Sequence, residues 1–226
     1  MSTVGAPRVV DLSHPITDGM RSYPGIPGPA ISAFLTHEQS RSRYDGQCEL
    51  TFSHVDIVAG VGTYLDAPYH RDAALPDHGT LPLSVTADVP GLVIDLTRRS
   101  GRPIAPDALG DPARWRDHAV ILRSGMEDHW DSDRYWTEWP YLTEDAARLL
   151  AGSGLTLLGV DFLNVDDTGD PRRPAHTALL RAGIPIIENL CNVGRLPASG
   201  FRLHAATLPL SRVASFPVRA YAVVDP

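Results

Sequence analysis

Proline and glycine are spread along the whole chain, and they limit it to short elements of secondary structure. The 226 residues include 20 prolines and 19 glycines, and no low-complexity linker separates two halves. Proline ends or kinks a helix and glycine weakens both helices and strands, so each cluster of these residues marks the end of an element. The even spread predicts a single domain, over residues 1–226, that is rich in short strands.

The apolar runs have the length and composition of strands. RVVDLSH ends in polar residues, and CELTFSHVDIVAG alternates between apolar and polar side chains. Four further runs are continuously apolar and end in a polar residue or glycine, as strands buried on both faces do. These four are GLVIDLT, AVILRSG, LTLLGVD and GIPIIENL. The proline-rich segment ITDGMRSYPGIPGP cannot be helical and is expected to form a long loop.

Three segments carry helical signals. Residues 141–154 have Thr143 as an N-cap, acidic residues in the first turn and glycines at the end. Residues 174–183 begin with Pro174 and end at Gly183, and residues 105–115 can supply a turn or two. Helices between buried strands predict an α/β domain, although the pattern is too irregular for a regular doubly wound sheet.

Charge and cysteine content exclude several classes of protein. The net charge of -7 and the scattered Lys and Arg residues leave no basic face for nucleic acid. There is no run of about 18 apolar residues and no signal-peptide pattern, so we expect no membrane partner and a cytoplasmic location. Cys48 and Cys191 fit no metal or redox spacing and are expected to be free thiols.

Glu188 is the most informative polar residue. It lies in the strand-like run GIPIIENL, where an ionised carboxylate is costly to bury unless a cation, a metal or several donors meet it. His176 lies near the start of the helical segment that leads into this strand, so the two side chains can belong to one site. The alternatives are that Glu188 faces water after a strand ending at Ile187, and that His176 is a half-exposed residue of a first helical turn.

The stretch AGVGTYLDAPYHRD, residues 59–72, gathers polar residues around two glycines and a proline. Asp66 and His70 are four residues apart, so a helical turn would place them on one face, where a carboxylate can orient an imidazole or both can approach a metal. The structural alternative is that Asp66 caps a short helix beginning at Ala67.

Other polar segments have weaker signals. Residues 126–141 hold His129 and three of the four tryptophans, which can wall a pocket or cover the edge of the core. Asp161, Asp166 and Asp167 follow a strand, where ligands of α/β proteins gather, but the glycine and proline there fit a solvated loop equally well. There is no P-loop, no GxGxxG after a strand and no serine nucleophile elbow, which excludes nucleotide-dependent and serine-hydrolase functions.

Five blocks of sequence, in order, resemble the cyclase-like family that includes bacterial kynurenine formamidase and isatin hydrolase. They are VVDLSHPITDGMRSYPG, GTYLDAPYH, LPLSVTADVPGLVIDL, YLTEDAARLLAGSGLTLLGVD and AHTALLRAGIPIIENL. The resemblance implies a swivelling β/β/α fold in a single domain with a mixed β-sheet. It also implies a homodimer or homotetramer, because relatives share active sites across subunits.

The family signature is His-x-Gly-Thr-His-x-Asp-x-Pro-x-His, and its members hold a divalent metal site. In the formamidases the first two histidines help to hold one metal, the aspartate can bridge two metals, and the last histidine acts as acid and base. In this chain Gly60 and Tyr64 replace those two histidines, and the other positions match: Gly62, Thr63, Asp66, Pro68 and His70. The two-metal site of the formamidases is therefore not expected to be intact.

The later histidine and glutamate of the family match His176 and Glu188. The resemblance thus implies that Asp66, His176 and Glu188 form an oxygen-rich set for one divalent metal, zinc or manganese, or that the site has none. His70 is the expected acid and base. Tyr64, a poor metal ligand and a good hydrogen-bond donor, is the second expected catalytic residue.

We expect a small-molecule substrate. Four further residues lie in segments that the family brings around its pocket, and they are expected to contact substrate: Tyr23, His37, His54 and Arg71. The predicted function is a hydrolase of a small cyclic or aromatic amide or ester, similar to an arylformamidase, with a metal-activated water. One alternative is a metal-free cyclase, dehydratase or isomerase that uses Tyr64 and His70, and the other is a non-catalytic binding relative.

Overall fold

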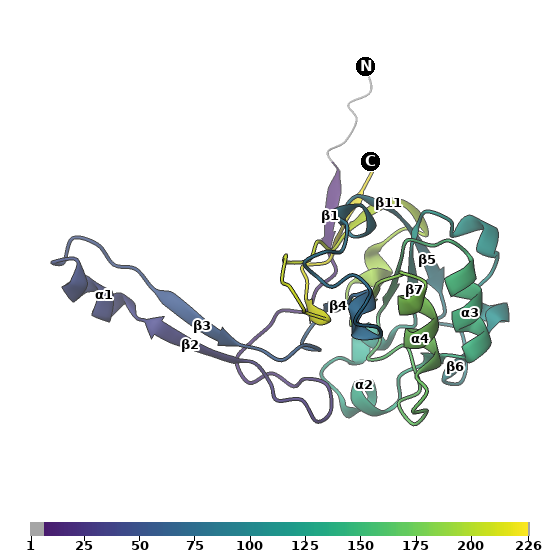
Figure 1. Cartoon of the computed structure of the whole chain (residues 1–226), viewed down its shortest axis with the longest axis horizontal. Coiled ribbons are helices and arrows are strands. Elements are labelled where there is room, and N and C mark those ends of the chain that lie inside the picture. The colour runs from purple at the N-terminus through teal and green to yellow at the C-terminus, as the bar shows by residue number, and fades with distance from the viewer. Residues whose placement is uncertain (1–6, 226) are drawn as a thin grey trace, which may run out of the picture.

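A nine-stranded mixed sheet forms the centre of the protein in the computed structural model, which describes residues 7–225 (Figure 1). The four middle strands are parallel, and the strands on both sides of them are antiparallel. The sheet confirms the predicted α/β class with a mixed sheet. In spatial order the strands are β1 (Arg8–Asp11), β13 (Tyr221–Val224), β11 (Ser199–His204), β5 (Val89–Asp95), β7 (Ala119–Arg123), β9 (Leu157–Val160), β10 (Ile186–Glu188), β4 (Tyr64–Asp66) and β12 (Ser215–Pro217).

The central strands are buried on both faces, as their continuous apolar runs predict. Alternate residues of β7 enter different cores: Val120 and Leu122 belong to one cluster of buried side chains, and Ala119 and Ile121 to the other. Helices α3 (Glu144–Gly152) and α4 (Pro174–Arg181) supply side chains to the first cluster, so they cover one face of the sheet. Figure 1 shows both helices side by side along that face.

The two longest helices begin where the sequence predicts. The Thr143 hydroxyl accepts a hydrogen bond from the backbone of Ala146 at the start of α3, and Pro174 occupies the first turn of α4. Residues 105–115 form two short 3-10 turns, Pro106–Ala108 and Pro112–Arg114, as expected. Helix α2 (Asp133–Thr137) and the pair β6 (Pro103–Ile104) and β8 (Tyr141–Leu142) complete the body. Tyr135, Trp136 and Trp139 are buried, so this aromatic segment covers the edge of the core.

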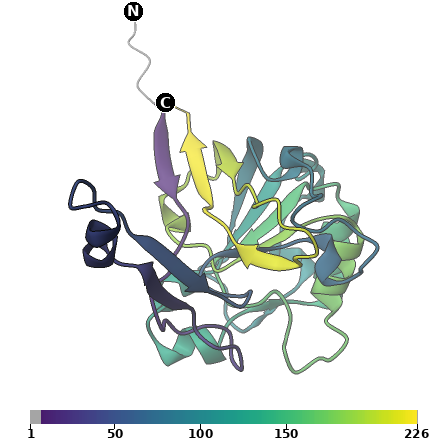
Figure 2. The same cartoon turned by 60° about the vertical axis from the view of Figure 1, so that its left-hand side comes forward.

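A long arm leaves the body on one side. It consists of strands β2 (Ala30–Leu35) and β3 (Phe52–Asp56), paired only with each other, and helix α1 (His37–Arg43) between them. Figure 1 shows the arm extending away from the sheet with α1 near its tip, and Figure 2 shows the same hairpin turned toward the viewer. Every residue of β3 is exposed.

The two ends of the described chain lie beside each other, since β1 pairs antiparallel with β13 at the edge of the sheet. Within residues 7–225 no helix is both long and apolar enough to cross a membrane. Cys48 and Cys191 are free thiols, as predicted.

Candidate active site

Strand β4 places Tyr64 and Asp66 on one face of the sheet, between two neighbouring strands. The two residues are two positions apart, so their side chains leave the strand on the same side. Glu188 of β10 lies directly opposite Tyr64, and Ser215 of β12 lies directly opposite Asp66. Directly opposed residues of antiparallel strands have side chains within contact distance. The register of three short strands therefore brings four polar side chains together.

Glu188 is fully buried, and two donors meet its carboxylate. The Tyr64 hydroxyl donates a hydrogen bond to Oε2, and the backbone N–H of Val165 donates to Oε1 at 2.8 Å. Burial raises the pKa of Glu188 to about 7, against the effects of the His176 charge and of these two hydrogen bonds. Glu188 is the last residue of β10 and is not exposed, so the alternative that it faces water is wrong.

Tyr64 is buried beside two carboxylates. Burial, followed by the negative charges of Glu188 and Asp66, raises the pKa of the Tyr64 hydroxyl well above its usual value. The hydroxyl therefore keeps its proton and acts as a hydrogen-bond donor to Glu188.

His176 enters the site from the first turn of α4, and Asp166 fixes its orientation. The Asp166 carboxylate accepts hydrogen bonds from the backbone N–H groups of Ala175 at 2.6 Å and His176 at 3.2 Å, and lies 2.7 Å from His176 Nδ1. The other ring nitrogen, Nε2, faces Asp66 Oδ2 at 3.5 Å and Glu188 Oε1 at 3.7 Å. His176 is only 6% exposed, so the alternative of a half-exposed residue is wrong.

The pKa values of His176 and Asp66 are both shifted by their neighbours in the site. Burial lowers the pKa of His176, but its hydrogen bond to Asp166 and its contacts with Asp66 and Glu188 outweigh that effect and raise the pKa to about 10. Burial raises the pKa of Asp66, but His176, His70 and Ser215 together lower it below its usual value. Three carboxylates thus surround one imidazole, and negative charge is in surplus at this point.

His70 completes the group from a short 3-10 turn, Pro68–His70, that follows β4. Ser215 connects it to Asp66: its hydroxyl donates to Asp66 Oδ1 and lies 3.3 Å from His70 Nδ1. Asp66 and His70 do not share a helix, because Asp66 ends the strand. The N-cap of the turn is Ala67, without a side-chain hydrogen bond, so the alternative that Asp66 is the cap is wrong.

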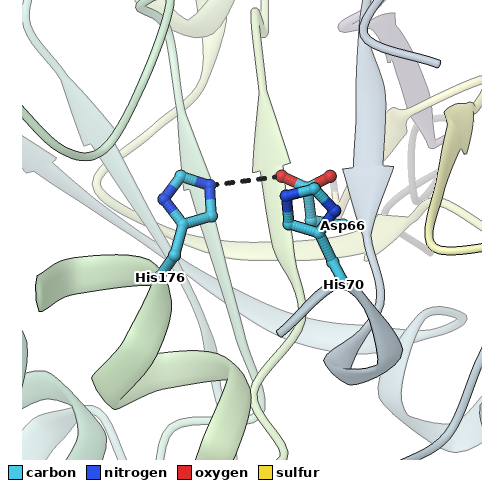
Figure 3. A group of neighbouring side chains, drawn as sticks. All are labelled: Asp66, His70 and His176. Atoms are coloured by element: carbon cyan, nitrogen blue, oxygen red, sulfur yellow. Dashed lines mark ion pairs between the residues drawn. The ribbon is translucent and has the colours of Figure 1, made fainter. Parts of the chain in front are cut away.

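The donor set fits one divalent cation. Asp66, His70 and His176 each offer a ligand atom, and these atoms lie within 4.8 Å of one another (Figure 3). The gaps of 3.5 and 3.7 Å from His176 Nε2 to the carboxylates exceed usual hydrogen-bond lengths. The Asp166–His176 contact holds one ring nitrogen, as is usual for metal-binding histidines, and a cation bound at the other nitrogen would replace the proton that the raised pKa keeps there. Glu188 is also close, but the Tyr64 hydroxyl and Val165 N–H engage its two oxygens.

A cavity of about 760 Å³ contains this polar group. Tyr23 and Arg71, two of the four residues expected to contact substrate, line it. His37 and His54 lie on the exposed arm and are not among the residues that line the cavity of a single copy. Five apolar side chains form much of the remaining wall: Ile26, Ile57, Val58, Val213 and Phe216.

Sequence reasoning did not assign Ser215 or Asp166 to the site. Ser215 has no local signal, since only the pairing of β12 with β4 brings it to Asp66. Asp166 was a weak candidate because its loop is rich in glycine and proline, yet it is fully buried. An aspartate in the loop between a continuously apolar strand and a helix that carries a site histidine is a signal that could have found it.

The chain belongs to the Cyclase family, described as "Putative cyclase", whose model matches residues 10–167. The kynurenine formamidase of Bacillus thuringiensis (strain Al Hakam) is 26% identical over 219 residues, covering 93% of this chain and 95% of the relative. This assignment confirms the resemblance that the five sequence blocks indicate.

Solved structures confirm the cyclase-like fold. Isatin hydrolase A from Labrenzia aggregata, bound to benzyl benzoate, superimposes with a TM-score of 0.84 at 20% identity, over 97% of this chain and 94% of that one. A structure from Bacillus stearothermophilus, described as a predicted metal-dependent hydrolase, has a TM-score of 0.77 at 25% identity, over 97% and 99% of the two chains.

Proposed function

We propose that the protein is a hydrolase that cleaves an amide or ester bond of a small aromatic or cyclic compound. The observation that carries the proposal is the convergence of Asp66, His176 and Glu188, with His70 beside them, in a largely apolar cavity. Relatives named kynurenine formamidase and isatin hydrolase support the same class of reaction. Apolar walls with a few converging polar groups are typical of small-molecule sites.

Asp66 and His176 would hold one divalent cation, zinc or manganese, with Glu188 on the buried side. When bound, such an ion acts as a Lewis acid toward a carbonyl oxygen and makes water a stronger nucleophile at neutral pH. The oxygen-rich set suits zinc or manganese but binds more weakly than a set of histidines. The loss of two family histidines, at Gly60 and Tyr64, makes a single ion the better fit to this site.

His70 is proposed as the residue that moves the proton. It is the exposed member of the group, so it faces the cavity where the leaving group departs. Ser215 lies between its Nδ1 and the Asp66 carboxylate and restricts the orientation of the ring. General acid–base catalysis by a positioned histidine contributes about 100-fold to 10,000-fold to a rate.

The test combines metal analysis with turnover. We expect the purified protein to contain about one zinc or manganese ion per chain and to hydrolyse N-formylkynurenine, isatin or a simple lactone. A chelator should remove both metal and activity. His70→Ala should keep the metal and lose about 100-fold or more of the turnover. His118→Ala, outside the cavity, is the matched control.

Two results would change this assignment. Loss of the metal in His70→Ala would make His70 a ligand, in keeping with the position of its ring nitrogen near Asp66 and His176. No turnover of any of these compounds by metal-loaded protein would overturn the hydrolase function and favour a binding role.

One observation favours a second candidate function. The Tyr64 hydroxyl is hydrogen-bonded to Glu188, at the position where the family has a metal-binding histidine. A tyrosine, a carboxylate and His70 in one cavity can perform proton transfer without a metal, in a cyclisation, dehydration or isomerisation. Turnover that survives complete removal of metal by a chelator would support this candidate against the first.

A further inference from the structure

Two arginines line the same cavity as the catalytic group, and they come from different parts of the chain. Arg71 follows the 3-10 turn of His70, and Arg173 is the N-cap residue of α4. The Arg71 Nε donates a hydrogen bond to Thr177 Oγ1 at 2.9 Å, and the backbone N–H of Thr177 bonds to the Arg173 carbonyl at 2.9 Å. Both arginines are thus attached to the first turn of the helix that carries His176.

Neither guanidinium is neutralised within residues 7–225, where no carboxylate lies within 4.0 Å of either. The neighbouring Arg172 shows the contrast, because it forms ion pairs with Asp170 at 2.7 Å and Glu144 at 3.1 Å. The loop therefore presents one ion-paired arginine to solvent, and to the cavity it presents one arginine with no carboxylate within 4.0 Å.

The backbone of Arg173 is in an unfavourable conformation. Its φ is 49° and its ψ is 62°, a left-handed conformation that residues other than glycine, asparagine and aspartate rarely adopt. Its side chain makes no capping hydrogen bond to α4, so helix capping does not explain the choice of arginine.

We propose that the cavity binds a substrate with a carboxylate group, which Arg71 and Arg173 hold while the amide or ester bond faces His176 and His70. Arginine pairs with carboxylates through parallel, charge-assisted hydrogen bonds. The apolar wall takes the hydrocarbon body of the substrate.

Arg173 and His176 both lie at the start of α4, three residues apart in the sequence, and both line the cavity. A carboxylate held by Arg173 is therefore in the same cavity as the reacting carbonyl. This inference of substrate class rests on the proposed hydrolase function.

The test compares two formamides that differ only in the acid, 2-formamidobenzoate and formanilide, by the release of formate. For the wild type we expect a higher kcat/KM with 2-formamidobenzoate than with formanilide. Arg173→Gln and Arg71→Gln should each reduce the kcat/KM for 2-formamidobenzoate about tenfold or more. Each variant should reduce the turnover of 2-formamidobenzoate by a larger factor than that of formanilide, because only the acid has a carboxylate for the two guanidinium groups. Arg172→Gln removes a neighbouring charge outside the cavity and is the matched control.

A binding measurement separates this inference from the proposed function. Titration with 2-aminobenzoate and with aniline requires no turnover, and we expect only the acid to bind with an affinity that falls in Arg173→Gln. If the protein hydrolyses neither the formamides nor the compounds named for the proposed function but this binding pattern holds, the hydrolase function fails and the anion site stands. Equal binding of the two compounds, or equal effects of Arg173→Gln on both formamides, would overturn the inference.

Discussion

Residue 64 determines what kind of polar group this site contains. Its register opposite Glu188 would direct any side chain at this position toward the buried carboxylate. Here tyrosine donates its hydroxyl proton to Glu188, where the family signature has a histidine that can bind metal.

Gly60 is the second position where the family signature has a histidine. Its φ is +90°, a backbone conformation that residues with a Cβ rarely adopt. Space is not the obstacle, since the nearest side-chain atom, Ile26 Cδ1, is 3.6 Å from where a Cβ would lie.

We predict that Tyr64→His increases metal affinity about tenfold or more, because an imidazole on β4 would face the same carboxylates as His176. The measurement is a metal titration of the metal-free protein, followed by elemental analysis. Gly60→His should give a smaller gain, because the backbone there disfavours a side chain.

Tyr64→Phe is the control for this experiment. It removes the hydroxyl and leaves the buried Glu188 with the Val165 N–H as its remaining donor, at an expected cost of about 1–3 kcal/mol in stability. If Tyr64→Phe raises metal affinity as much as Tyr64→His, the gain comes from freeing Glu188 rather than from a new ligand. No gain in either variant would contradict the prediction.

At the scale of elements, the sequence predicts what local signals determine. Thr143 and Pro174 mark the starts of α3 and α4, and continuous apolar runs mark the central strands. Helix α1 was missed although Thr36 and Gln39 form a capping box, a signal that is visible in the sequence.

The order of the strands was beyond sequence reasoning from the residues alone. The site depends on β4, a strand of three residues, pairing with β10 and with β12, which lie more than a hundred residues later in the chain. Local propensity contains no information about such pairing. For this reason Glu188 and His176 could be suspected from their place in apolar segments, while Ser215 could not.

One buried residue outside the site links the ends of two central strands. Asp161, after β9, accepts hydrogen bonds from Ser124 N at 2.8 Å, Ser124 Oγ at 2.6 Å and Gly125 N at 2.7 Å, after β7. Burial raises its pKa from 3.8 to about 6, although these hydrogen bonds oppose the change. The folded protein therefore binds the proton more tightly than the unfolded chain does.

We predict that this contribution to stability is fully present below pH 3.8 and is lost as the pH rises through about 6. The difference between these pKa values corresponds to about 3 kcal/mol. The measurement is the free energy of unfolding by denaturant for wild type and Asp161→Asn, from pH 4 to 7. The difference between the two proteins isolates the titration of Asp161, because the other groups titrate in both. The stability of wild type relative to the variant should fall with rising pH, and a constant difference would contradict the assignment.

At the scale of the whole molecule, the arm is the part that a single copy does not explain. A two-stranded hairpin is marginally stable in water unless something packs against it. On the arm, Phe34 is 77% exposed and Phe52 is 53% exposed. Strand β3 leads directly into Ile57 and Val58, which form part of the cavity wall. We propose that a second copy covers the arm in a homodimer or homotetramer, which would also bring His37 and His54 to a cavity.

We predict that the purified protein is a dimer or larger in light scattering after gel filtration, and that Phe34→Ser with Phe52→Ser shifts it toward monomer. Burial of such side chains contributes about 1.5–3 kcal/mol each, so their loss from a shared interface weakens association strongly. Leu83→Ser removes a similarly exposed side chain, 63% exposed, from the body and should leave the assembly unchanged.

Activity should fall with dissociation if His37 and His54 act in the partner's cavity. A wild-type protein that is monomeric at all concentrations would contradict both the predicted oligomer and the proposed role of His37 and His54, because each requires another copy to cover the arm.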